Sequence, residues 1–112
     1  MRDKGEIYMQ DNIVLTEATY YILLALYSPQ HGYGIMQEVE AMSNGRVRLA
    51  AGTLYGVLSS MVDKGWIVQL PIDPGSRKKN YQITDLGLSV LRNEVERLRE
   101  LVTNGDNILG GK

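Results

Sequence analysis

Residues 51–83 read AGTLYGVLSSMVDKGWIVQLPIDPGSRKKNYQI, and this stretch decides the fold. In its first half, apolar residues recur at the spacing of an amphipathic helix, so we predict a helix over residues 51–64 that Gly65 caps. Its second half predicts a β-hairpin. Residues 65–70 are rich in strand formers, Pro74-Gly75 is a strong turn signal, and residues 80–83 form the return strand.

The rest of the chain adds helices on both sides of this stretch. We predict a loose arm over residues 1–15 that contains a short helix at 7–10, and then a helix from Thr16 to about Tyr27. A second helix covers residues 31–42 and ends at residues 43–45, and a short extended piece follows at 46–49. After the hairpin, a final helix runs from Thr84 to about Thr103 and ends at Asn104-Gly105. This order indicates a mainly α fold with a small β-hairpin. We therefore expect a winged helix-turn-helix over residues 16–83, followed by a C-terminal helix and tail over residues 84–112 that we expect to mediate dimerisation.

Length and composition exclude several classes of protein. The chain has 112 residues, 44% hydrophobic and 22% charged, which fits one ordinary globular domain. Without cysteine it has no disulfide, no thiolate metal site and no cysteine nucleophile. The longest apolar stretches, such as residues 20–27, are too short to cross a bilayer, and the N-terminus lacks the apolar core of a signal peptide. We therefore expect a soluble, cytoplasmic protein with no membrane partner.

The near-zero net charge of −1 hides an uneven distribution. Residues 1–45 carry two basic and six acidic side chains, residues 46–79 carry six basic and two acidic, and residues 80–112 carry four basic and five acidic. The positive charge therefore gathers in the segment that holds the third helix and the hairpin, as expected of a nucleic-acid contact.

The outward face of the helix over 51–64 consists of small residues with one tyrosine at its border. These are Gly52, Thr53, Gly56, Ser59, Ser60, Asp63 and the bordering Tyr55. Small side chains let a helix enter the major groove of DNA closely. The alternative is a solvated face that happens to be small, although Glu and Lys suit such a face better.

The hairpin adds Arg77, Lys78 and Lys79 beside its turn, where an exposed protrusion suits a phosphate backbone or a minor groove. The alternative is an ordinary solvated turn. Together the candidate DNA contacts are Tyr33, Thr53, Tyr55, Gly56, Ser59, Ser60, Lys64, Arg77, Lys78 and Lys79.

The final helix has more apolar surface than one domain face needs. Its heptad row is Leu88, Leu91, Val95, Leu98 and Val102, and a second row of Leu86, Val90 and Leu101 runs beside it. One row can pack on its own domain, and we expect the heptad row to form a homodimer seam. The alternative is an intramolecular seam against the first helix.

Enzyme chemistry finds little support in the sequence. His31 is the only histidine, and no catalytic triad, phosphate-loop motif or metal-ligand cluster is recognisable. We predict no catalytic residue, no metal and no cofactor.

The ordered set of motifs resembles the PadR family of bacterial transcriptional regulators. The matching pieces are residues 21–26, His31-Gly32-Tyr33-Gly34-Ile35, Gly52-Thr53-Leu54-Tyr55 with Leu58, Gly65-Trp66-Ile67, and residues 77–84 with Gly87. The resemblance implies a homodimeric repressor of the short branch, which binds double-stranded operator DNA of inverted-repeat form through helix 51–64 and wing 67–83. Gly56 stands where members often have Pro, and Ser59-Ser60 stand where basic residues are common. The resemblance therefore implies that the wing makes a larger share of the DNA contacts than in other members.

Some short members bind flat aromatic drugs between tryptophans of their last helices. The last helix here has no tryptophan, and Leu98 lies near the corresponding place. We therefore expect a small apolar or aromatic effector, if one acts, to bind an apolar pocket at the dimer interface without tryptophan stacking. The alternative to the whole interpretation is a winged-helix protein-interaction module that does not bind DNA.

Overall fold

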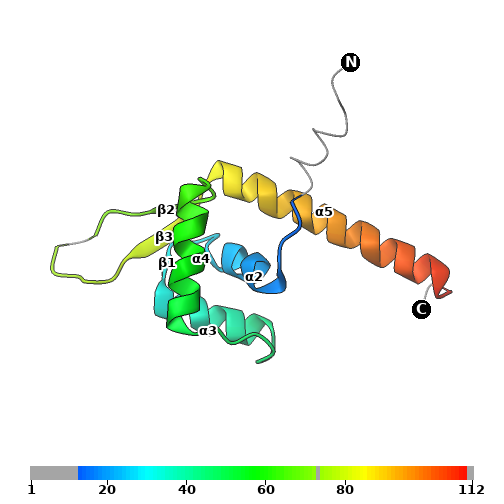
Figure 1. Ribbon diagram of the computed structural model, residues 1–112, viewed down its shortest axis with the longest axis horizontal. Coiled ribbons are helices and arrows are strands. Elements are labelled where there is room, and N and C mark those ends of the chain that lie inside the picture. The colour runs from blue at the N-terminus through cyan, green and yellow to red at the C-terminus, as the bar shows by residue number, and fades with distance from the viewer. Residues whose placement is uncertain (1–12, 73, 111–112) are drawn as a thin grey trace, which may run out of the picture.

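Helices carry most of the chain, and a small sheet lies beside them (Figure 1). The computed structural model describes residues 13–72 and 74–110, so the predicted helix at residues 7–10 lies outside the described residues. The elements are α2 (Glu17–Ala25), β1 (Gln30–His31), α3 (Gly32–Met42), α4 (Ala51–Asp63), β2 (Ile67–Gln69), β3 (Asn80–Ile83) and α5 (Asp85–Ile108). The mainly α fold with its winged helix-turn-helix is confirmed.

The predicted helix boundaries rest on caps that the structure confirms. The Thr16 hydroxyl accepts the Thr19 N–H at 3.1 Å, and the Thr84 hydroxyl accepts the Gly87 N–H at 3.1 Å, so α2 and α5 begin where the sequence places them. Gly65 follows Lys64, the C-cap residue of α4, and has a φ of 78°, a left-handed conformation that glycine adopts without strain.

The prediction of a short strand at residues 46–49 is wrong, because the structure has no strand there. The Val47 N–H donates to the Ser43 hydroxyl at 2.9 Å, which takes this backbone away from sheet pairing. The third strand is instead β1, directly before α3, and the antiparallel sheet has the order β1-β3-β2. A strand of two residues is too short to show an alternating pattern.

The predicted end of the last helix at Asn104-Gly105 is also wrong. α5 continues to Ile108, the Leu109 N–H donates to the Gly105 carbonyl at 2.9 Å, and Gly110 takes the left-handed conformation with φ 89°. A glycine inside a helix costs only about 1 kcal/mol, so Gly105 weakens this helix without ending it.

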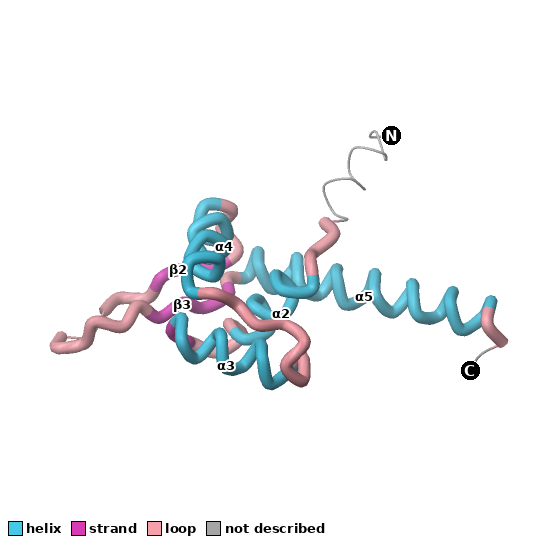
Figure 2. Tube along the Cα trace, turned by 60° about the horizontal axis from the view of Figure 1, so that its bottom comes forward, coloured by secondary structure: helices cyan, strands magenta, loops and turns pink. Residues whose placement is uncertain are grey.

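The core lies around α2, which packs against α3 and α5, while α4 packs against α3 and β2. Ile22, Leu23 and Leu26 of this central region are fully buried. In Figures 1 and 2 the loop of the β2–β3 hairpin projects from one side of this body and α5 extends from the other. The fold therefore holds the wing and the long helix at opposite ends of one small core.

Candidate nucleic-acid interface

A hollow of about 440 Å³ lies between the start of α3, the helix α4 and the wing. Its lining residues are His31, Gly32, Tyr33, Tyr55, Arg77, Lys78 and Lys79. The fold thus brings five of the ten candidate contacts, from three separate segments, around one cavity. His31 and Gly32 also line this hollow. The sequence did not predict them as contacts, although both belong to the same His-Gly-Tyr-Gly motif as Tyr33.

Glycine at position 32 makes room for Tyr55. A Cβ atom at Gly32 would lie 2.9 Å from Cζ of Tyr55, so any larger residue displaces this ring. Gly34 makes room in the same way for Gln30, whose amide donates to Glu38 Oε1 at 2.7 Å. The His-Gly-Tyr-Gly motif therefore lets the ring of Tyr55 lie against the start of α3.

Tyr81 of β3 is buried and does not line this hollow. Burial raises the pKa of the Tyr81 hydroxyl, and the neighbouring Tyr55 adds to the rise. The phenol of Tyr81 stays protonated at neutral pH, so it adds no negative charge beside the basic wing.

The wing triplet Arg77, Lys78 and Lys79 is exposed, and none of the ion pairs found in the described residues involves it. The other cations of the basic segment are engaged locally. Arg46 pairs with Glu17, and Arg48 Nε lies 3.6 Å from Glu40 Oε2. The positive charge that takes part in none of these ion pairs of the described residues therefore concentrates on the wing.

The outward face of α4 is open. Thr53, Gly56, Ser59 and Ser60 are exposed, and a Cβ atom at Gly56 would meet no other atom within 4 Å. Ser59 also lines a smaller hollow of about 210 Å³ between α4 and the hairpin. This face can approach another molecule closely.

Lys64 is not brought to the hollow at the wing. It is the C-cap residue of α4, and its Nζ is 4.8 Å from the centre of the Trp66 ring. This cation–π contact gives Lys64 a packing role at the beginning of the hairpin.

The heptad row of α5 divides between core and surface. Leu91 is 4% exposed and belongs to the core of its own chain, whereas Leu88, Val95 and Leu98 are half-buried and Val102 is 62% exposed. Val95, Leu98 and Val102 line an apolar hollow of about 430 Å³ with Tyr20 of α2. The side chain of Leu91 is therefore not available to a second chain.

Residues 13–72 and 74–110 contain no cluster of metal-ligating side chains and no membrane-spanning helix. Within them, no three His, Asp or Glu side chains gather closely enough to hold a metal ion. No helix in this part of the chain has the length and apolar character that crossing a membrane requires.

Fold and site together define a winged helix-turn-helix protein with a basic wing. The sequence model of the PadR-like family of transcriptional regulators matches residues 22–93, most of the chain. The protein belongs to this family, and it is a transcriptional regulator and not an enzyme.

The chain is also similar to individual proteins in sequence and in fold. An uncharacterized protein of Lysinibacillus sphaericus is 31% identical over 84 residues, which cover 70% of this chain and 77% of that protein. A PadR family transcription regulator of Clostridium difficile R20291 has a similar fold, with a TM-score of 0.71 at 21% identity over 84% of this chain and 99% of that one. A PadR family regulator of Eggerthella lenta DSM 2243 is 28% identical, with a TM-score of 0.63 over 81% and 79% of the two chains.

Proposed function

We propose that this protein is a homodimeric repressor that acts in the cytoplasm by binding an inverted-repeat operator in double-stranded DNA. Residues 16–83 bind DNA, with α4 in the major groove and the wing on the backbone. Residues 84–112 join the two chains. A two-fold dimer of this kind reads two half-sites spaced by one helical turn or a multiple of it.

The hollow shared by Tyr33, Tyr55 and the wing triplet carries the proposal. Tyrosine hydroxyls and cationic side chains are groups that contact DNA phosphates and fix the register of a protein on the duplex. The small residues of α4 lie next to this cluster on an open face, so base edges and phosphates can be contacted together.

The free half of α5 supports a homodimer. No residue of α5 after Glu94 is buried, yet the helix continues to Ile108 with exposed Leu101, Val102 and Ile108. An isolated helix of about 14 residues is marginal in water, so this half needs an apolar partner. A second copy of α5 provides one, and a small apolar or aromatic effector would occupy the hollow beside Leu98 and Val102.

The wing supplies the direct test. Changing Arg77, Lys78 and Lys79 together to Ala should weaken binding to a duplex from the protein's own promoter region by about 10-fold or more. It should also reduce the slope of log affinity against log salt by about two to three. Fluorescence anisotropy titrations over a range of salt concentrations measure both quantities.

Arg92→Ala is a matched control, because Arg92 is an exposed arginine on α5, away from the wing. An unchanged affinity and salt slope in the triple variant would contradict the role of the wing. Binding that resists high salt and selects a protein over duplex DNA would favour a winged-helix interaction module instead.

A further inference from the structure

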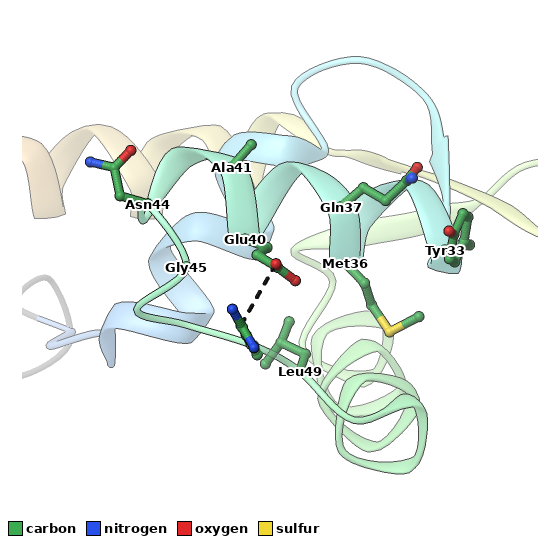
Figure 3. Close-up of a pocket in the computed structure, with 9 residues that line it drawn as sticks. Tyr33, Met36, Gln37, Glu40, Ala41, Asn44, Gly45 and Leu49 are labelled. Carbon is green, nitrogen blue, oxygen red and sulfur yellow. Dashed lines mark ion pairs between the residues drawn. The ribbon is translucent and has the colours of Figure 1, made fainter.

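A second and larger hollow, of about 710 Å³, lies along α3 and the linker that joins α3 to α4 (Figure 3). Tyr33, Gln37, Glu40, Asn44 and Arg48 contribute its polar groups. Tyr33 also lines the hollow at the wing, so the two cavities adjoin at this one side chain. Together they run from the wing triplet, past Tyr33, to Arg48.

Arg48 lies on the linker, three residues before α4 begins at Ala51. Its guanidinium pairs with Glu40, with Nε 3.6 Å from Oε2, and the two side chains are 74% and 52% exposed (Figure 3). An ion pair this exposed is weak and screened by salt. Arg48 can therefore exchange the Glu40 carboxylate for another anion at little cost.

The groups along the two hollows match the chemistry of a DNA strand. The wing provides cations at one end, Arg48 provides a cation at the other, and the Tyr33 hydroxyl and the Gln37 amide provide donors between them. The Asn44 amide lies beyond Glu40, at the end away from Tyr33 (Figure 3). Such groups make the phosphate and sugar contacts of DNA-binding proteins. Tyr33 and Glu40 are seven residues apart on α3, about 10 Å along its axis. A strand running beside the helix presents about two phosphates over that length, because successive phosphates are farther apart along the strand than the rise per base pair.

We infer that the two hollows form one track for the sugar–phosphate backbone of a single DNA strand, in which Arg48 binds a phosphate and Glu40 competes with DNA for Arg48. The inference rests on the proposed function and extends its contact surface from the wing to the α3–α4 linker. Glu40 acts there as an internal anion that lowers the affinity for every DNA sequence, so non-operator DNA is held less tightly.

Four variants and two controls test the track. The variants are Arg48→Gln, Glu40→Gln, their combination, and the triple alanine variant of the wing. The controls are Arg46→Gln and Glu17→Gln, because Arg46 lies on the same linker, pairs with Glu17 and lines neither hollow. Each protein is titrated against a duplex from its own promoter region and against a duplex of scrambled sequence, from about 50 to about 200 mM salt.

Arg48→Gln should weaken binding to both duplexes about fivefold and lower the salt slope by about one, because one phosphate contact is lost. Glu40→Gln should tighten binding to both duplexes about two- to fivefold, the effect of removing one exposed competitor. In the Arg48→Gln background the gain from Glu40→Gln should largely disappear, since the two residues act through each other. The control Arg46→Gln should change DNA affinity less than Arg48→Gln does, and the control Glu17→Gln less than Glu40→Gln does.

Three results would overturn the inference. If Arg48→Gln matches Arg46→Gln while the wing variant still loses affinity, the proposed function stands and the track does not. If Glu40→Gln raises the DNA affinity equally with and without Arg48, Glu40 simply repels DNA. In that case Glu40 does not compete with DNA for Arg48. If neither Arg48→Gln nor the wing variant changes binding, both the track and the proposed DNA interface fail. Circular dichroism melts confirm that each variant is folded.

Discussion

Gly32 and Gly87 both lack room for a methyl group, but different atoms obstruct it. At Gly32 the obstacle is the ring of Tyr55, the far end of a side chain that can rotate away. At Gly87, in the first turn of α5, it is the backbone of Trp66, whose carbonyl carbon would lie 2.9 Å from the added Cβ. The first glycine therefore positions a candidate DNA contact, and the second allows α5 to pack on the start of the hairpin.

Alanine at these two positions should have opposite consequences. Gly32→Ala should change the free energy of unfolding by less than about 1 kcal/mol but weaken DNA binding several-fold, because Tyr55 is displaced. Gly87→Ala should cost about 1–3 kcal/mol or more, because a backbone has to shift. Denaturant unfolding and anisotropy titration measure the two effects.

Gly105→Ala, at an open position of α5, is the control and should stabilise the fold by about 0.5–1 kcal/mol. Equal destabilisation by Gly32→Ala and Gly87→Ala would contradict this account.

The helix α5 is joined to the beginning of the described chain by a buried carboxylate. Glu94 is 2% exposed, accepts the Leu15 N–H at 3.1 Å, and forms two hydrogen bonds with the Arg97 guanidinium at 2.7 and 2.6 Å. The Arg97 hydrogen bonds lower the pKa of Glu94, burial opposes this, and the Leu15 N–H lowers it further. The chain ahead of α2 is thus fixed to α5 by a carboxyl group that is ionised at neutral pH.

Stability should therefore fall in acid partly through Glu94. Because its pKa is lower in the folded chain, Glu94 stabilises the fold above the unfolded pKa of roughly 4.3, and this contribution disappears as the pH falls through the folded pKa. Glu94→Gln should cost about 1–3 kcal/mol at neutral pH and much less once the pH is below the lowered pKa of Glu94 in the folded chain, as measured by urea unfolding at several pH values. Glu96→Gln is the control, because Glu96 forms an exposed pair with Arg99, and it should change little. A cost for Glu94→Gln that does not vary with pH would refute the assignment.

The molecule as a whole is extended for its length. Its radius of gyration is 16.4 Å and its principal extents are 55 × 40 × 21 Å, whereas a compact domain of this size has a radius of about 13 Å. The wing and the free half of α5 account for the difference, since both project from the core (Figures 1 and 2). A second copy packed along α5 would cover the apolar side chains of this projection.

A charge placed on the free half of α5 should separate the two chains. Val102→Glu should convert a dimer to a monomer and weaken operator binding, because an unpaired charge is buried at the seam. Val102 is exposed in the single chain, so its own fold should remain intact. Sedimentation at several protein concentrations measures the mass. Asn93→Glu, at another exposed position of α5, should remain dimeric. A wild-type mass equal to one chain at every concentration would exclude the homodimer.

Most helices and the hairpin could be predicted from the sequence because their signals are local. Thr16, Thr84 and Gly65 set helix ends through bonds or dihedral angles within a few residues, and β3 follows from a short run of strand formers. The strand β1 and the true end of α5 could not be predicted in this way. Two residues become a strand only because β3 lies beside them, and Gly105 continues a helix that its neighbours sustain.

The sequence by itself determined the family, the fold class and the basic segment, since periodicity, caps and charge order are properties of the chain. Only the tertiary structure decided which charges and apolar groups are available. It paired Arg46 and Arg48 with acids from the first 45 residues, placed Lys64 on Trp66, and took Leu91 into the core. The physical reason is that charge compensation and burial depend on neighbours in space, which the order of residues alone does not give.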